Sequence, residues 1–236
     1  MADVKNVAQA GPFGKRKRLL AKQSQDEGLC IMAKGIALST QPKTFLTEQE
    51  YLDLERKAGH KSEYCQGEKF AMAGAGEPHN LLAANLLATL HQQLRRGPCR
   101  VYPSDMRVRV TATGLYTYPD VTALCAEPRF VDERKDTLLN PSFIAEVLSP
   151  ATEGYDRGRK FEHYRSIETL TEYLLVAQDR IHVDLYTRQA DGRWVLSEAS
   201  RLEEALDLPS LRCRLSLADL YEKVDLTAAS GHFRAP

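Results

Sequence analysis

The sequence predicts an α/β fold in which a mixed β-sheet is flanked by helices. Leucines at helical spacing predict a helix over residues 81–94, which Gly97-Pro98 ends. Three strand-like segments follow it, at 100–110, 116–125 and 142–148. A helix over 156–167 and a further strand then complete an αβββαβ order. Because strands and helices do not alternate in this order, a doubly wound parallel sheet fits poorly.

The remaining predicted elements lie on either side of this core. Thr47 and Glu50 form a capping-box pattern that opens a short helix, and Gln66-Gly67 turns a hairpin of strands around 61–65 and 68–73. The last strand of the core is predicted at 172–177, and the extra carboxyl-terminal elements are strands at 181–187 and 193–198 and a closing helix that begins at Ser216.

We therefore expect one domain over residues 44–224, between a flexible basic amino-terminal extension (1–43) and a tail (225–236). The sequence leaves open whether Met1 or Met32 is the natural start.

Composition indicates a soluble protein without a membrane span. The formal net charge of the 236 residues is zero, which argues against a protein that coats DNA through bulk charge but only weakly against an enzyme. We interpret Arg95-Arg96 and the stretch from Arg107 to Arg109 as a solvated face. The five cysteines are scattered and form no C-x-x-C pair, which disfavours structural zinc and a disulfide framework. A reducing compartment, and hence a cytoplasmic location, fits best.

Several catalytic motifs are missing, and their absence narrows the function. The sequence has no P-loop, no G-x-G-x-x-G after a strand, no G-x-S-x-G and no H-E-x-x-H. Its six histidines are dispersed, without the close spacing of a zinc pair. Serine-hydrolase and zinc-hydrolase chemistry therefore have little support.

Two carboxylates lie inside apolar, strand-like segments, where a charge is costly. Asp120 lies in the segment from Tyr118 to Leu124 and Glu146 in the segment from Ser142 to Leu148, and Lys160 follows on a helix. A buried carboxylate needs a metal, a cation or good hydrogen bonds. Carboxylate oxygens are the ligands that Mg²⁺ and Mn²⁺ prefer, so the set predicts a divalent-metal site.

Each of these residues also has a simpler interpretation. Asp120 could accept a turn hydrogen bond after Pro119, Glu146 could pair with a buried arginine, and Lys160 could pair on the helix surface with Asp156, four residues away.

At this point the chain resembles a known group of nucleases. Pro119-Asp120 followed by Glu146-Val147-Leu148 is similar to the PD-(D/E)XK signature, and the ordered series more closely resembles the Uma family of predicted restriction endonucleases. The stretches that carry the resemblance are Ser104–Val108, Tyr116–Val121, Glu146–Pro150, Tyr155–Tyr164 and Glu172–Val176. The resemblance runs from about Thr44 to Val224 and implies a restriction-endonuclease-like fold.

The resemblance also implies roles for residues of the site. Asp120 and Glu146 would hold Mg²⁺ (or Mn²⁺), and Lys160 would assist the attacking water. Leu148 stands where the superfamily signature has its lysine, and the family resemblance implies that the lysine has moved to the following helix, at Lys160. There Lys160 and Tyr164 are four residues apart and share a face.

Four further residues are candidates for supporting this site, and Tyr164 is the first of them. By resemblance to the family, Glu63 substitutes for an acid that the superfamily carries on the helix before the first core strand; alternatively it is an exposed acid on an edge hairpin. Asp105 either reaches the site or pairs with Arg107. His79, next to Asn80, either contacts phosphate or caps the long helix.

The expected function is hydrolysis of DNA phosphodiester bonds by a metal-activated water, in a Mg²⁺-dependent endonuclease. A homodimer would suit the two strands of duplex DNA. The alternative is a nuclease-like fold that binds nucleic acid or a partner without cutting, supported by Leu148 and the neutral net charge. A hydrolase of small phosphate esters would use the same ligands.

Overall fold

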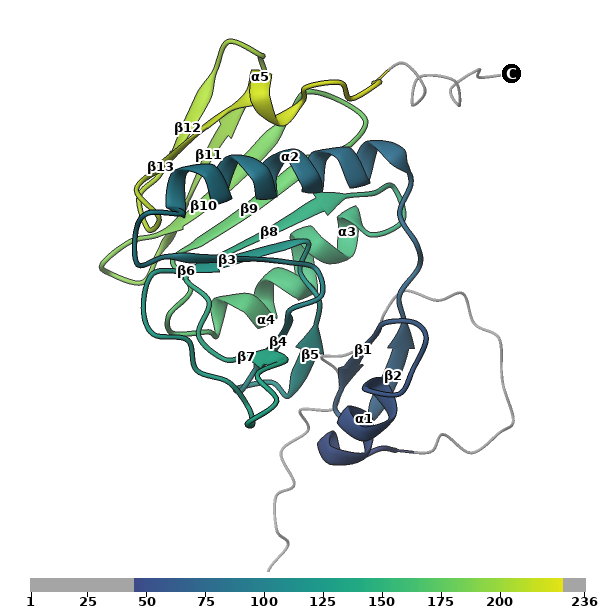
Figure 1. The fold of residues 1–236 in the computed structure, drawn as a ribbon. Helices are drawn as coiled ribbons and strands as arrows, with labels where there is room; N and C mark the ends of the chain where they lie inside the picture. Colours follow the sequence, from purple (N-terminus) through teal and green to yellow (C-terminus); the bar gives the residue numbers. More distant parts are fainter. Residues whose placement is uncertain (1–44, 227–236) are drawn as a thin grey trace, which may run out of the picture.

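The computed structural model describes residues 45–226, in which two mixed β-sheets and a separate hairpin pack with the helices (Figure 1). The predicted extension over 1–43 and most of the predicted tail lie outside the described residues. Among the described residues, no helix is long and apolar enough to cross a membrane.

The helices are short except for one. They are α1 (Glu48–Glu55), α2 (Glu77–Leu94), α3 (Glu153–Tyr155), the π-helical η1 (Asp156–Lys160), α4 (Phe161–Arg165) and α5 (Leu217–Leu220). The capping box predicted at Thr47 and Glu50 is confirmed at the start of α1, and Ser216 caps α5 as predicted. The helix predicted over 81–94 begins earlier, at Glu77, because Pro78 fits the first turn of a helix.

The strands are β1 (Ser62–Cys65), β2 (Glu68–Ala71), β3 (Arg100–Pro103), β4 (Arg107–Val110), β5 (Leu115–Thr117), β6 (Val121–Leu124), β7 (Thr137–Leu138), β8 (Phe143–Leu148), β9 (Glu172–Ala177), β10 (Val183–Arg188), β11 (Trp194–Ala199), β12 (Ala205–Leu208) and β13 (Cys213–Ser216).

A six-stranded sheet forms the centre of the fold, in the order β11-β10-β9-β8-β6-β3, with β8 and β9 parallel and the other neighbours antiparallel. Helix α2 lies along one side of this sheet, and α4 lies on the other (Figure 1). Side chains alternate between these two sides along β8. Ala145 and Val147 pack with the leucines of α2, whereas Ile144 and Leu148 pack with Phe161 and Tyr164.

A five-stranded sheet, in the order β2-β1-β5-β4-β7, holds the amino-terminal part of the domain. Tyr51 of α1 stacks on Tyr64 of β1 with ring centroids 4.8 Å apart, and Tyr116 of β5 meets both rings edge-on. This aromatic cluster fixes β1 between β2 and β5, so Glu63 is a buried residue of an inner strand. The alternative interpretation, in which Glu63 is an exposed acid on an edge hairpin, is therefore wrong.

Two predicted strands are each divided between the two sheets. The segment 100–110 becomes β3 and β4, and 116–125 becomes β5 and β6. The second division falls at Pro119, which has no backbone N–H to donate to a neighbouring strand. The single mixed sheet expected from the sequence is thus two sheets, and the chain crosses between them directly before Asp120. Strands β7, β12 and β13 were not predicted.

Two predictions from composition are wrong. Cys99 and Cys125, which flank the paired strands β3 and β6, form a disulfide bond, although the cysteine pattern disfavoured one. Arg107 is 3% exposed rather than solvated: it pairs with Asp136 and donates to Tyr118 and Thr137. Neither the disulfide nor the contacts of Arg107 can be read from spacing in the sequence, because the partners are far apart along the chain and come together only when the sheets form.

Asp136 should make stability depend on pH. Its carboxylate accepts from Arg56 Nε at 2.8 Å, which is the main reason why its pKa falls to about 2, and Arg107 lies 3.2 Å away. A depressed pKa contributes stability that is complete above the unfolded-state value, near 3.8, and is lost as the pH falls through about 2.

We therefore expect Asp136→Asn to lower the free energy of unfolding by roughly 1 kcal/mol at pH 7, a value reduced for solvent screening of this partly exposed pair. The difference from wild type should shrink below about pH 4. Urea unfolding at pH 7, 5 and 3.5 measures it, with the exposed Asp207→Asn as control. A difference that stays constant down to pH 3.5 would contradict the assignment.

Candidate functional site

A cavity of about 710 Å³ lies where the two sheets meet the starts of α2 and η1. Its wall includes Glu63 from β1, His79 from α2, Glu146 from β8 and Lys160 from η1, together with Asp120. The structure thus brings five of the sequence-predicted site residues to one hollow. The loop 71–76, made largely of alanine and glycine, forms another part of the wall.

Strand pairing sets Asp120 against Glu146. In the antiparallel pair β6–β8, Val121 lies opposite Ala145 and Thr122 opposite Ile144. Continuing this register by one residue places Asp120 opposite Glu146. Like charges directly opposite each other on neighbouring strands are destabilising. The pair therefore needs a compensating cation.

In each of these two carboxylates, one oxygen makes the contacts with nitrogen and hydroxyl groups of the protein. Asp120 accepts through Oδ2 from the backbone N–H of Val147 at 2.8 Å, and His79 Nε2 lies 3.3 Å from the same oxygen. Glu146 accepts through Oε1 from Tyr164 Oη at 2.7 Å, and Lys160 Nζ lies 2.8 Å from that oxygen. Neither Asp120 Oδ1 nor Glu146 Oε2 is engaged by these donors, which suits a pair of metal ligands.

Lys160 lies among three carboxylates. Its Nζ is 2.8 Å from Glu146, 3.4 Å from Asp156 and 3.5 Å from Glu63, and the residue is 5% exposed. The pairing with Asp156 that the sequence offered as a simpler interpretation is present. It exists together with the contact to Glu146, so Lys160 points into the site and not to the helix surface.

Helix η1 and helix α4 carry Lys160 to this position. Phe161, Tyr164 and Ile167 are buried against the sheet, as the sequence predicted. The π-helical turn widens the helix directly before Phe161, and such turns are frequent at functional sites. Leu148, two residues after Glu146, lies in the core on the same side of β8. Lys160 approaches that side from the helix instead.

Burial dominates the electrostatics of the site. It raises the pKa of Glu146 to about 8, an effect that Lys160 opposes and that Asp156 and Asp120 increase. Burial also raises the pKa of Asp156. For Lys160, burial acts to lower the pKa, but Glu146 and the other nearby groups outweigh it and raise the pKa well above its ordinary value.

The donor set fits a hard divalent cation. Four carboxylate residues line the cavity (Glu63, Asp120, Glu146 and Asp156) together with two lysines, Lys61 and Lys160, so formal negative charge exceeds formal positive charge there. Burial is the main cause of the raised pKa of Glu146, and the neighbouring carboxylates of Asp156 and Asp120 raise it further. Mg²⁺ or Mn²⁺ at Asp120 and Glu146 would supply the missing positive charge.

Glu63 belongs to this network. It is 3% exposed and accepts a short hydrogen bond from Thr117 Oγ1, while Tyr155 Oη lies 3.5 Å from its other oxygen. Of the two sequence interpretations of Glu63, the exposed one is wrong.

His79 and Asp105 lie differently from expectation. The residue that caps α2 is Gly76, and His79 lies inside the first turn, where it meets Asp120. The capping interpretation is therefore wrong. Asp105 is neither in the cavity wall nor paired with Arg107. Its side chain is 85% exposed and lies 2.6 Å from Lys61, which does line the cavity.

The sequence reasoning did not propose Asp156 as a site residue. It is 3% exposed, lines the cavity and contacts Lys160. The signal in the sequence is its spacing four residues before Lys160, which the simpler interpretation of Lys160 explains by a surface ion pair. Tyr155 was missed as well, and it lies beside Glu63 and Lys160.

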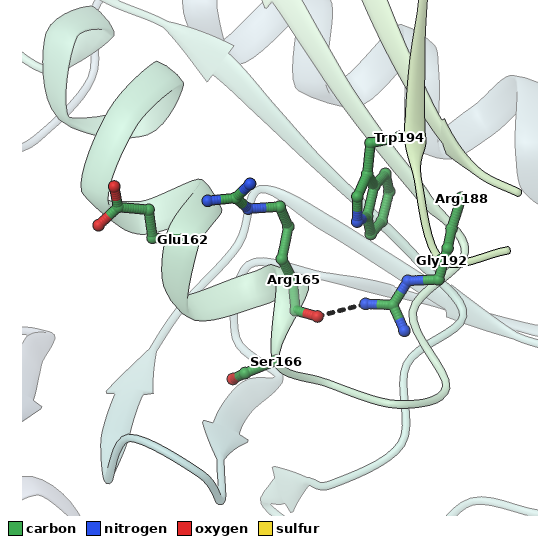
Figure 2. Close-up of a pocket in the computed structure, with 6 residues that line it drawn as sticks. All are labelled: Glu162, Arg165, Ser166, Arg188, Gly192 and Trp194. Carbon is green, nitrogen blue, oxygen red and sulfur yellow. Dashed lines mark hydrogen bonds between the residues drawn. The ribbon is translucent and has the colours of Figure 1, made fainter.

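A second hollow, of about 490 Å³, lies at the carboxyl-terminal end of α4 (Figure 2). Arg188 donates there to the backbone carbonyls of Arg165 and Glu168, so it caps the end of the helix, and its guanidinium lies 4.9 Å from the Trp194 ring centroid. Glu162 is the one carboxylate residue in the wall of this hollow. This second hollow therefore contains no pair of carboxylates that could bind a metal ion.

Comparison with known proteins identifies the family of the chain. The family model described as "Uma2: Putative restriction endonuclease" matches residues 48–219, which is most of the chain. The chain belongs to the Uma2 family. The match covers all the predicted site residues, from Glu63 to Tyr164.

Two uncharacterized proteins of Synechocystis sp. are similar to this Uma2 chain. The protein sll1609 is 41% identical over 153 residues, covering 65% of this chain and 86% of the relative. The protein slr1290 is 34% identical over 178 residues, covering 75% and 91%.

A crystal structure shares the fold of this Uma2 protein. A protein of Anabaena variabilis, described as a putative nuclease belonging to DUF820, matches with a TM-score of 0.60 and 18% identity. The match covers 75% of this chain and 98% of the other chain.

Proposed function

We propose that this protein is a Mg²⁺- or Mn²⁺-dependent endonuclease that hydrolyses phosphodiester bonds of DNA. The observation that carries the proposal is the position of Asp120, which directly precedes β6 and accepts from the backbone N–H of Val147, next to Glu146, whose carboxylate lies 2.8 Å from Lys160 Nζ. Membership of the Uma2 family supports the same reaction class.

In this proposal the cation would be held by Asp120 and Glu146, where it would polarise the phosphate and lower the pKa of a bound water. The protein's own residues arrange the rest. The backbone N–H of Val147 fixes Asp120, and Tyr164 fixes Glu146, so both carboxylates are positioned before substrate arrives.

Lys160 would act through its charge. Three carboxylates surround the ammonium group, which keeps it protonated, so it serves as a hydrogen-bond donor and not as a base. From that position it orients the attacking water and offsets the negative charge that develops on the phosphate. Asp156 and Glu63 hold the lysine in place.

The residues that line the cavity suit the entry of a DNA strand. The loop 71–76 carries small side chains apart from Met72, and His60, Lys61 and His79 supply nitrogen donors for phosphate oxygens. A homodimer remains our proposal for cutting both strands.

The deciding experiment is nicking of supercoiled plasmid by the purified chain with Mg²⁺ or Mn²⁺. We expect metal-dependent cutting by wild type and by Asp105→Asn, whose acid is exposed outside the cavity. Glu146→Gln and Lys160→Ala should each lose at least about 100-fold in rate. Equal cutting by all variants would identify a contaminant and overturn the proposal.

Parallel substrates separate the alternatives. Cutting of bis(p-nitrophenyl) phosphate with no cutting of plasmid would favour a hydrolase of small phosphate esters. Binding of DNA without cutting under any of these conditions would favour the inactive, nucleic-acid-binding alternative, for which Leu148 in the signature lysine position is the sequence argument.

A further inference from the structure

A second group of metal-binding side chains lies outside the cavity, at the edge of the six-stranded sheet. His182 directly precedes β10, Asp184 lies in β10 and Glu198 lies in the edge strand β11. His182 Nε2 is 3.0 Å from Asp184 Oδ1 and 3.7 Å from Glu198 Oε1. One ligand atom from each residue lies within 4.8 Å of the others.

The strand register assembles this group. Asp184 lies directly opposite Glu198 in the β10–β11 pair, and His182, two residues before Asp184, lies on the same side of the sheet. The main chain at His182 is held on both sides by one hydroxyl group. Tyr221 Oη accepts from the backbone N–H of His182 at 3.1 Å and lies 2.9 Å from its carbonyl oxygen.

The charges around the group do not balance. Arg157 of η1 pairs with Asp184 Oδ2 and with Glu153, and Arg180 pairs with Glu153 and Asp179. Four acids, Glu153, Asp179, Asp184 and Glu198, are thus linked by these pairs and by His182 to only two arginines. Arg157 occupies Asp184 Oδ2, so Oδ1 is the oxygen directed toward His182. Asp184 is only 2% exposed, where an excess of negative charge is costly.

We propose that His182, Asp184 and Glu198 bind a divalent transition-metal ion of the Zn²⁺ type. An imidazole with two carboxylates is a donor set that suits Zn²⁺ better than Mg²⁺ or Ca²⁺. Glu198 is 59% exposed and can close the remaining distance, and solvent supplies further ligands at this open edge. None of the three residues lines the candidate catalytic cavity, so the proposal does not rest on the nuclease function.

Such an ion would tie the edge strand to the helix of Lys160. It would join β11 to β10, and Arg157 connects Asp184 to η1, the same helix that carries Lys160. We expect the bound ion to stabilise the sheet edge. The unfolding temperature should rise by roughly 5 °C when the free Zn²⁺ concentration is a hundred times the Kd of the site.

The test uses the full chain titrated with Zn²⁺ alone by isothermal titration calorimetry. His182→Ala and Glu198→Gln should each bind at least about 10-fold more weakly than wild type. His91→Ala, an exposed histidine of α2, is the matched control and should bind as wild type does. The double variant Asp120→Asn/Glu146→Gln lacks the candidate catalytic ligands and should keep this Zn²⁺ site.

Visible absorption of bound Co²⁺ gives a second readout, and we expect the bands of wild type to be lost in His182→Ala. Circular dichroism checks that the variants fold; the exposed Glu198 makes Glu198→Gln the safer of the two. The proposal is overturned if wild type binds no Zn²⁺, or if both Glu198→Gln and His182→Ala bind it as tightly as wild type. Loss of Zn²⁺ binding in the double variant alone would place the ion in the cavity and would equally overturn it.

Discussion

Asp120→Asn should lower the affinity for Mg²⁺ by at least about 100-fold and abolish metal-dependent cleavage, with little change in stability. Asparagine keeps a side-chain oxygen that can accept from the backbone N–H of Val147, so the local hydrogen bond survives. The substitution removes the negative charge that faces Glu146, and with it the attraction for a divalent cation.

Calorimetric titration with Mg²⁺, beside plasmid nicking, measures both effects. Asp105→Asn is the matched control, because it removes an acid that is 85% exposed and paired only with Lys61 among the contacts described. If Asp120→Asn bound Mg²⁺ as well as wild type, Asp120 would not be a ligand, whatever the effect on cutting.

Lys160→Met should lose both activity and stability. Methionine matches the length of the lysine chain but leaves Glu146, Asp156 and Glu63 without the cation that they surround. Removing one partner of a buried ion pair costs about 3–5 kcal/mol because the remaining charge is uncompensated. We therefore expect a fall of about 3 kcal/mol in the free energy of unfolding, measured by urea denaturation.

Added Mg²⁺ provides the diagnostic arm of this experiment. A cation bound among the remaining carboxylates should recover part of the lost stability of Lys160→Met, while cleavage stays lost. Lys223→Met, at an 82% exposed lysine, should change neither property. Unchanged stability of Lys160→Met would mean that the lysine is not compensating the buried acids.

Much of the fold could be read from local patterns. The capping box at Thr47, the buried strands 143–148 and 172–177 and the apolar side of α4 depend on neighbours in sequence, and all were predicted close to their true bounds. The division of the chain at Pro119 could not be read in the same way. Both β5 and β6 are apolar, and only their partners β1 and β8 decide that they belong to different sheets.

The candidate site shows the same division. Asp120 and Glu146 could be selected because a charge within an apolar segment needs compensation, which is a local argument, and Lys160 could be selected from the family resemblance. The inclusion of Glu63 and Asp156, and the exclusion of Asp105, depended on how the two sheets meet. A hairpin acid and a surface acid look alike in sequence, yet one is 3% exposed and the other's side chain is 85% exposed.

The sequence by itself determined the order of the main helices and strand-like segments, the family resemblance and the choice of Asp120, Glu146 and Lys160 as candidate site residues. The tertiary structure decided which groups share a cavity, that Cys99 meets Cys125, and that His182, Asp184 and Glu198 gather at the sheet edge. The physical reason is that burial and charge compensation depend on which residues are neighbours in space, whatever their separation along the chain. Contacts between residues far apart along the chain leave no periodic signal in the sequence.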